Sequence, residues 1–278
     1  MLTIGVNPVA FTIGSLEIRW YGIMIAIAVA SLFVVTFREA KRLGLTRYLY
    51  SIFLWGILGG LIGGRLAYVI YYWEDFVGNP LKIIGFEGLA QNGMLIGIIV
   101  AALIYMGVIR MRFSTLLSMG DAVAVGTPLA LGIGRIACTL NGCCYGLPSP
   151  FHFFPLAVTY THPNSLAPLN TPIYPTQIYH VLWGLIVFAI VWRFRGKFKP
   201  EGGLVFFCFC IFAVGDLGLR FLRDEAPVLW GLRAAQVVDL VALAIFLPWL
   251  IIMLRQFKKK TLVAELANEA EPEQNRED

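Results

Sequence analysis

The amino-acid sequence predicts an all-α membrane protein, a helical bundle with seven transmembrane helices. Three observations support this fold class. Hydrophobic residues make up 58% of the 278 residues and charged residues only 14%, whereas soluble domains carry about 25% charged residues. Seven apolar runs are long enough to cross a membrane. Clusters of basic residues follow every second run and predict an outside N-terminus and a cytoplasmic C-terminus.

The apolar runs can be placed in order along the chain. A transmembrane helix needs about 20 mostly apolar residues, and runs of this length are too long for barrel strands. The second run is rich in glycine, which lets membrane helices approach closely. The third run is short and is expected to begin earlier. The runs cover residues 20–37, 52–72, 93–106, 122–140, 175–191, 204–222 and 237–254.

The segments outside these runs complete the predicted organisation. Residues 1–261 are predicted to form one transmembrane domain, and the polar, acidic residues 262–278 a disordered cytoplasmic tail. The proline-rich residues 141–171 form the one sizeable loop, whose aromatic side chains are expected to lie on the bilayer surface. Residues 1–14 lack the basic start and apolar core of a cleaved signal peptide.

The placement of basic residues predicts the orientation in the membrane. Fourteen of the 22 lysines and arginines follow the first, third, fifth and seventh runs, in groups of four, two, four and four. With the N-terminus outside, all four groups lie on the cytoplasmic side. The net charge of +5 therefore predicts a lipid bilayer as partner and no nucleic acid. The groups are Arg38, Lys41, Arg42 and Arg47; Arg110 and Arg112; Arg193, Arg195, Lys197 and Lys199; and Arg255, Lys258, Lys259 and Lys260.

Four arginines lie inside or at the ends of apolar runs, in the half predicted to face outward. Arg135 stands in the fourth run, Arg65 late in the second, and Arg220 and Arg223 near the end of the sixth. A guanidinium stays charged and is costly in hydrocarbon, so such residues usually face a polar cavity. Arginine also presents a planar fork to phosphate oxygens. We therefore predict a positively charged pocket for an anionic lipid head group.

The sixth run also predicts how Arg220 is paired. Asp216, Arg220 and Asp224 are spaced four residues apart and would share one helix face, with a carboxylate one turn to each side of the guanidinium. The alternative interpretation is that such pairs only hold helices together. With Asp239 included, the four arginines exceed the acids by one, so the pocket keeps a positive charge.

Seven ordered stretches carry a resemblance to a known family. They are Arg19-Trp20-Tyr21-Gly22, Gly63-Gly64-Arg65-Leu66-Ala67-Tyr68, Asn92-Gly93-Met94-Leu95-Ile96-Gly97, Gly134-Arg135-Ile136 with Asn141-Gly142 and Tyr145-Gly146, Tyr174-Pro175-Thr176-Gln177-Ile178-Tyr179, Arg220-Phe221 with Asp224, and Gln236. Each is weak alone. In this order and spacing they resemble the prolipoprotein diacylglyceryl transferase family along nearly the whole chain. The seven-span, N-outside topology of that family agrees with the topology predicted above.

The resemblance implies a reaction and its substrates. An enzyme of this family transfers the diacylglyceryl group of phosphatidylglycerol to the sulfur of the lipobox cysteine of a prolipoprotein. This is the first step of bacterial lipoprotein maturation. The expected partners are phosphatidylglycerol, the signal peptide and lipobox of prolipoproteins, and the bilayer. The active site would face the outer leaflet of the bacterial inner membrane, and neither a cofactor nor a metal is implied.

The resemblance also assigns roles by position. Arg135 would bind the lipid phosphate, and Arg220 would be the second arginine, with Asp224 as its acidic partner. Tyr21 and Asn141 would be polar residues of the cavity and, with these three, form the expected catalytic set. The expected substrate-binding residues are Arg135, Arg65, Tyr68, Asn92, Gln177, Asp216 and Gln236.

Several acid–base groups of the family pattern are replaced in this sequence. The family histidine corresponds to Asn92, an asparagine to Cys138 and a glutamate to Cys143. A tyrosine corresponds to Asp216, and the residue that ends the Tyr-Pro-x-Gln-x-Tyr-Glu stretch is His180. The arginines expected to hold the phosphate match the pattern, whereas the groups expected to move protons do not.

Two explanations keep the pocket as a lipid site. In the first, Asp216, Asp224 or His180 accepts the thiol proton, or the step needs little help from a base. In the second, the chain is a phospholipid-binding or phospholipid-carrying membrane protein of the same fold, or a transferase with different chemistry.

A third explanation gives the cysteines a new role. Cys138, Cys143 and Cys144 could form a disulfide, bind a metal together with His152 or His162, or act as nucleophiles in thiol-redox chemistry. For Cys143 and Cys144 the simpler interpretation, small half-buried residues, is favoured because the spacing is not that of a metal finger. The other two cysteines, Cys208 and Cys210, are predicted to be packing residues.

Overall fold

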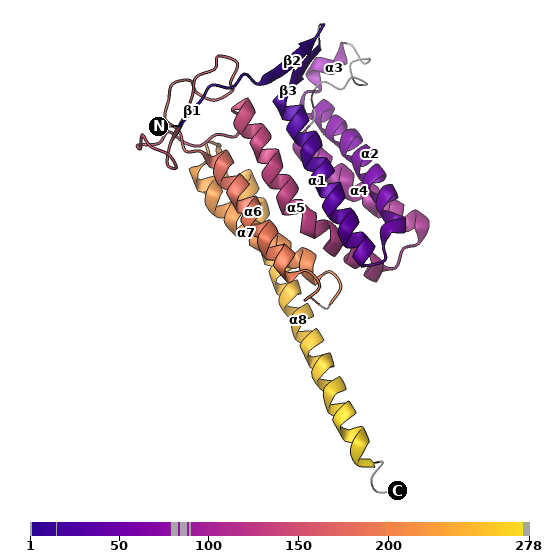
Figure 1. Ribbon diagram of the computed structural model, residues 1–278. Helices are drawn as coiled ribbons and strands as arrows, with labels where there is room; N and C mark the ends of the chain where they lie inside the picture. The colour runs from indigo at the N-terminus through magenta and orange to yellow at the C-terminus, as the bar shows by residue number, and fades with distance from the viewer. Residues whose placement is uncertain are drawn as a thin grey trace. The chain divides into compact units, whose positions relative to one another are not determined.

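The computed structural model describes residues 2–14, 16–78, 83, 88, 90–198 and 200–274. Over these residues the protein is mainly helical (Figure 1), which confirms the predicted class of helical membrane protein. Short strands are also present, so the chain is not strictly all-α. The helices are α1 (Trp20–Arg42), α2 (Thr46–Tyr71), α3 (Glu74–Val77), α4 (Gln91–Ile109), α5 (Phe113–Asn141), α6 (Thr176–Phe194), α7 (Gly203–Leu219), the 3₁₀ turn η2 (Arg220–Leu222) and α8 (Ala234–Gln274).

Six of the described helices are long and apolar enough to cross a membrane. They are α1, α2, α5, α6, α7 with its following turn, and α8. A shorter apolar segment, Ile96–Ile109, lies in α4, and this helix begins two residues before the predicted run, at Gln91. Each of the seven predicted runs thus falls on one helix. Whether all seven cross the membrane, and in which orientation, stays a prediction.

The chain divides into two compact units. The first comprises Met1–Thr36 and Gly120–Asp278, and the second comprises Phe37–Met119. The borders fall inside α1 and α5, so both helices continue from one unit into the other. The single transmembrane domain expected over residues 1–261 stays a prediction.

In the second unit, α2 and α4 pack through glycines. Gly59 and Gly63 on α2 face Gly93 and Gly97 on α4. A Cβ added at Gly97 would lie 2.0 Å from the carbonyl oxygen of Gly59, and one added at Gly63 would lie 2.4 Å from that of Gly93. The two backbones are therefore in direct contact, as expected for small residues spaced four apart on membrane helices.

In the first unit, the core joins α1, α5, α6 and α7. Val35, Val125, Val187 and Leu204 are among its buried residues. Cys208 belongs to the same cluster, and its thiol donates a hydrogen bond to Ala124 O at 3.5 Å. This agrees with the prediction that Cys208 is a packing residue. Figure 1 shows α6, α7 and α8 side by side in this unit.

The segment between α5 and α6 is folded around a small core of its own. Val158, Tyr160, Ala167 and Ile173 are buried there. The strand β4 (Val158–Tyr160) pairs in parallel with β1 (Leu2–Ile4). The surface loop that we expected over residues 141–171 is therefore a compact segment, because its scattered apolar residues bury one another without any regular period. Two antiparallel pairs complete the strands: β2 (Val9–Ile13) with β3 (Leu16–Arg19), and β5 (Pro227–Leu229) with β6 (Leu232–Arg233).

The last helix, α8, extends beyond its apolar part. It continues through Gln274, and so includes most of the segment 262–278 that the composition predicted to be a disordered tail. Residues 275–278 lie outside the described residues.

The glycine contact between α2 and α4 predicts a large effect of a side chain at position 97. We expect Gly97→Val to lower the free energy of unfolding by about 1–3 kcal/mol, because overpacking at a tight contact forces the backbones apart. Thermal unfolding of the detergent-solubilised protein measures this effect. Gly107→Val is the matched control, because a Cβ at Gly107 meets no atom within 4 Å. Equal losses in the two variants would show that the contact does not hold the helices together.

Candidate active site

The chain turns sharply where α5 ends at Asn141. Gly142 adopts a positive φ of 74°, a conformation that glycine takes without steric cost. A Cβ at this position would lie 2.1 Å from Ser165 Oγ, so only glycine fits. Cys144 also has a positive φ, of 59°, which is uncommon for a residue with a side chain. Residues with such uncommon backbone angles are frequent at functional sites, where contacts with the surrounding structure stabilise them.

Side chains from the start of α6 hold this turn in place. Thr176 Oγ1 donates a hydrogen bond to Cys144 O at 3.0 Å. Gln177 Nε2 donates to Cys143 O at 3.0 Å and to the Tyr160 hydroxyl at 3.4 Å. Thr176 and Gln177 are fully buried. Because buried hydrogen bonds are strong and costly to break, the side chains that the turn carries are preorganised.

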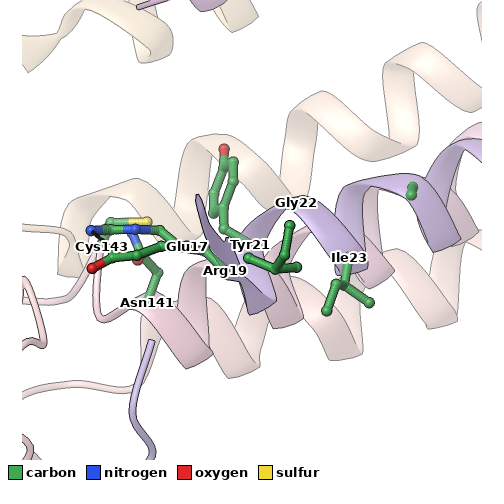
Figure 2. A pocket seen from close by; sticks show the side chains of 9 residues that line it. Glu17, Arg19, Tyr21, Gly22, Ile23, Asn141 and Cys143 are labelled. Carbon is green, nitrogen blue, oxygen red and sulfur yellow. Dashed lines mark hydrogen bonds and ion pairs between the residues drawn. The ribbon is translucent and has the colours of Figure 1, made fainter. Parts of the chain in front are cut away.

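A cavity of about 860 Å³ lies between this turn and the first turns of α1 (Figure 2). Tyr21 and Asn141, both expected as polar residues of the cavity, line it together with Cys143. The structure thus brings these residues to one place, whereas their chemical roles stay predictions. The full lining is Glu17, Ile18, Arg19, Tyr21, Gly22, Ile23, Ala26, Asn141 and Cys143.

Arg135 is half-buried on α5, less than two turns before the end of the helix. Among the residues that the structure describes, its guanidinium makes no hydrogen bond and no ion pair. Arg135 is not among the residues that line the cavity. It lies on the same helix as Asn141, which lines the cavity, and its charge lowers the pKa of the Cys144 thiol in the turn. An arginine without a counter-ion in an apolar helix is costly in a membrane. An anionic ligand at this place would compensate the charge.

Arg220, in contrast, is compensated by acids from α7, from α8 and from the segment after η2. It pairs with Asp216 on α7, with Glu225 at 3.5 Å between Nη1 and Oε2, and with Asp239 on α8 at 3.9 Å between Nε and Oδ2. Asp216 is buried and its Oδ1 also lies 3.0 Å from His180 Nε2. The predicted pair of Asp216 and Arg220 is therefore present. Its setting is a buried charge network that joins α6, α7 and α8.

The other predicted partner of Arg220, Asp224, does not pair with it. α7 ends at Leu219, and the following residues form the 3₁₀ turn η2, so positions spaced four apart no longer share a helix face. Asp224 is exposed, and its backbone N–H donates to Tyr145 O at 3.2 Å. The prediction that Asp224 balances Arg220 is wrong, because this stretch pairs with the segment after α5 and leaves the helix.

Glu225 takes the place expected for Asp224, and sequence reasoning missed it. Its carboxylate also binds Arg223, at 2.9 Å between Oε1 and Nη2. Arg223 in turn acts on Cys144, as Arg135 does. With Glu225 counted in place of Asp224, the four arginines still exceed the acids by one. Arg135 pairs with none of these acids among the described residues.

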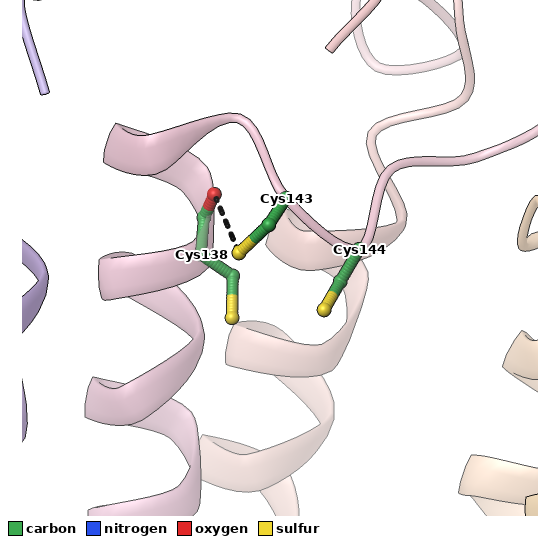
Figure 3. A group of neighbouring side chains, drawn as sticks. All are labelled: Cys138, Cys143 and Cys144. Carbon is green, nitrogen blue, oxygen red and sulfur yellow. Dashed lines mark hydrogen bonds between the residues drawn. The ribbon is translucent and has the colours of Figure 1, made fainter. Parts of the chain in front are cut away.

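Three cysteines form a compact group beside the cavity. Cys138 on α5 and Cys143 and Cys144 in the turn have sulfur atoms that all lie within 4.8 Å of one another (Figure 3). All three are free thiols. Among the described residues, neither His152 nor His162 belongs to this group.

The Cys144 thiol has an unusual environment within this group. Its pKa is lowered, first by the neighbouring Cys138 and Cys143 thiols and then by the charges of Arg223 and Arg135, whereas the pKa of Cys143 is raised. A thiolate is the reactive form of cysteine and the form that binds metals. The turn therefore favours a negatively charged sulfur next to the cavity.

Comparison with known proteins decides the family. The family described as prolipoprotein diacylglyceryl transferase matches residues 8–253. The chain belongs to the prolipoprotein diacylglyceryl transferase family. Three relatives named phosphatidylglycerol–prolipoprotein diacylglyceryl transferase illustrate the similarity. That of Dehalococcoides mccartyi (strain ATCC BAA-2266) is 36% identical over 94% of this chain and 98% of its own length. That of Clostridium tetani is 32% identical over 79% and 86%, and that of Lysinibacillus sphaericus 30% identical over 96% and 99%.

In this member of the diacylglyceryl transferase family, two glutamines expected to bind substrate are fully buried. Gln177 holds the turn after α5, as described above. Gln236 Nε2 donates to Leu217 O at 3.1 Å, and its Oε1 accepts from Arg233 N at 2.9 Å, so it joins the start of α8 to α7. Both side chains thus make structural hydrogen bonds, and a direct contact with substrate stays a prediction.

The remaining residues of the predicted set lie in the second unit. Arg65 donates to Ile83 O at 2.9 Å and to Gly88 O at 3.2 Å. Its guanidinium carbon lies 5.6 Å from the centre of the Tyr68 ring, within the range of a cation–π contact. The side chain of Asn92 lies outside the described residues. The share of Arg65, Tyr68 and Asn92 in the transferase site therefore stays a prediction.

The charge network predicts unequal effects for two aspartates. Asp216→Asn should lower the free energy of unfolding by about 1–3 kcal/mol, because it removes the buried acid that lies nearest to Arg220 and leaves only Glu225 and Asp239 at longer distances. Asp224→Asn makes the same chemical change at an exposed position and should stay within about 0.5 kcal/mol. Denaturant unfolding of the solubilised protein measures both. A comparable loss in Asp224→Asn would restore the pairing that the sequence predicted.

Proposed function

We propose that this chain transfers the diacylglyceryl group of phosphatidylglycerol to the lipobox cysteine of a prolipoprotein, the first step of bacterial lipoprotein maturation. Membership of the family and the names of its relatives support the reaction. The observation that carries the proposal here is Arg135. It is a cation inside an apolar helix that has no counter-ion among the described residues, and it stands less than two turns before Asn141, which lines the cavity.

The chemistry requires this kind of cation. The sulfur of the prolipoprotein attacks the carbon of the diacylglyceryl group that carries the phosphate ester. A carbon–sulfur bond forms, the carbon–oxygen bond breaks, and its electron pair leaves with the glycerol phosphate. Negative charge grows on the phosphate oxygens during this step. Arg135 offers a planar fork of donors to these oxygens and stabilises the growing charge.

Arg220 and Arg223 support this step from the segment after α7. Arg220 is bound to three acids and fixes the segment that carries Arg223. Arg223 acts on Cys144, close to Arg135. In this proposal Arg135 holds the phosphate, and Arg220 is a positioning residue that keeps the neighbouring charges in place.

We also propose the topology and location that follow from the sequence. Seven spans with the N-terminus outside and the C-terminus in the cytoplasm place all four basic groups on the cytoplasmic side. The first turns of α1 and the end of α5, which line the cavity, then lie at the outer leaflet of the bacterial inner membrane. Prolipoproteins and phosphatidylglycerol reach the site from this side.

Replacement of Arg135 tests the phosphate assignment. Arg135→Ala should lower transfer by about 100-fold or more, because removing one group that stabilises developing negative charge costs about 10²–10³ in rate. The assay uses a strain depleted of its own transferase and measures the mass of a reporter lipoprotein. Arg112→Ala, at an exposed arginine before α5, is the control and should keep full activity. Full transfer by Arg135→Ala would remove this residue from the mechanism.

The same assay separates the transferase from a lipid-binding protein of the same fold. That alternative is motivated by Asn92, because an amide at the position of the family histidine cannot act as a base. If the unaltered chain binds phosphatidylglycerol vesicles but leaves the reporter without a thioether-linked diacylglyceryl group, the lipid-binding alternative holds and the transferase proposal fails.

A further inference from the structure

We propose that Cys138, Cys143 and Cys144 bind a zinc ion through three thiolates, and that the open fourth position of this ion takes the thiol of the prolipoprotein substrate. The first part concerns the chain alone. The second part rests on the proposed function and says how the thiol of the prolipoprotein is activated. The resemblance to the family implies no metal, so the proposal stands on the geometry of this chain.

The distances between the sulfur atoms fit one metal ion. All three lie within 4.8 Å of one another, and Figure 3 shows them at the corners of a triangle between α5 and the turn. Zinc binds sulfur at about 2.3 Å in tetrahedral geometry, which places two bound sulfurs about 3.8 Å apart. Each sulfur–sulfur distance therefore has to shorten by about 1 Å at most for the three thiolates to bind one ion, and small side-chain rotations are enough for this.

The backbone holds the three ligands ready. Adjacent residues in an extended chain point to opposite sides, but the positive φ of Cys144 turns its sulfur to the same side as that of Cys143. Thr176 and Gln177 fix the two carbonyl groups of this pair, and the third ligand, Cys138, stands on α5. A metal site needs ligands whose positions are set by surrounding hydrogen bonds, and this turn provides them.

The charge around the three cysteines and their access to the cavity also suit a zinc ion. A zinc ion with four thiolates carries two negative charges. Arg135 stands three residues before Cys138 on α5, and Arg223 pairs through its backbone with Gly146, two residues after Cys144. Soft thiolate ligands select zinc and copper(I) among biological metals. Zinc matches the chemistry better, because it has no redox chemistry and takes a fourth ligand readily. Cys143 lines the cavity, so both the ion and a substrate thiol have a route to the site.

The bound ion would replace the missing base. A thiol that coordinates zinc loses its proton outright, and this proton passes to water in the cavity. The zinc-bound sulfur then attacks the diacylglyceryl carbon, the bond to the phosphate oxygen breaks, and the thioether leaves the metal. No general base is needed. This accounts for two features of the sequence at once, the amide at Asn92 and the thiols at Cys138 and Cys143.

Metal content tests the first part without any activity assay. The full-length chain, purified in detergent with zinc present, should hold one zinc ion per chain. Replacement of zinc by cadmium should give thiolate-to-metal charge-transfer absorption. The triple variant Cys138→Ser, Cys143→Ser, Cys144→Ser should lose both signals, and Cys143→Ser alone should lower zinc affinity by about tenfold or more. Cys208→Ser is the control, because a serine hydroxyl can keep the hydrogen bond to Ala124 O.

Three results would overturn the zinc site. The first is an unaltered chain that holds less than one zinc ion. The second is a triple variant that holds as much zinc as the unaltered chain. The third is a disulfide among Cys138, Cys143 and Cys144 in the isolated protein. The cadmium spectrum of the unaltered chain does not depend on whether a variant folds. It therefore decides the question even if the triple variant is unstable.

Transfer to a thiol substrate tests the second part. A chelator should lower transfer by about tenfold or more, and added zinc should restore it. Full transfer by the chelated protein would show that the ion does not activate the thiol. An unaltered chain that binds zinc but never forms the thioether would contradict the proposed function and leave the zinc site intact.

Discussion

A guanidinium among apolar helices must be compensated, and the manner of compensation explains the roles of the arginines. Arg220 is bound by three acids, and Arg65 donates to two backbone carbonyls. Such contacts offset the cost of holding the charge and tie elements together. Arg135 makes no such contact among the described residues. This difference is why we propose that Arg135 binds the lipid phosphate, whereas Arg65 and Arg220 hold the fold together.

The turn after α5 is the second constraint, because the cavity, the cysteines and Arg223 all meet there. Its carbonyls accept from Thr176 and Gln177, so the Tyr-Pro-Thr-Gln stretch supports the site from behind. We expected Gln177 to bind substrate directly. It is buried, and its hydrogen bonds to Cys143 O and to the Tyr160 hydroxyl order the turn. Its contact with substrate stays a prediction.

The sequence predicts well what depends on local composition. Long apolar runs predict the helices, and the glycines of the second run predict close packing of that helix. The structure identifies α4 as its partner. The prediction for Asp224 is wrong because it assumes that the helical period continues past the end of the helix. Helical spacing assigned it to Arg220, but α7 stops at Leu219 and the chain pairs with Tyr145 instead. Contacts of this kind join residues far apart in sequence. The grouping of the cysteines likewise depends on one positive φ, which no residue pattern reveals.

The pattern of retained and replaced residues has a physical logic. The proposed reaction needs one group of side chains for the phosphate and another for the thiol. The arginines expected to hold the phosphate match the family pattern, whereas the groups expected to move protons are replaced. Simple loss of a base would leave unrelated residues at the replaced positions. Here two of them, Cys138 and Cys143, are cysteines, and the fold brings both to Cys144 within 4.8 Å. A thiol is a poor base at neutral pH but a strong metal ligand once ionised. The convergence of three thiols therefore argues for a changed way of activating the substrate sulfur, with the phosphate side of the reaction unaltered.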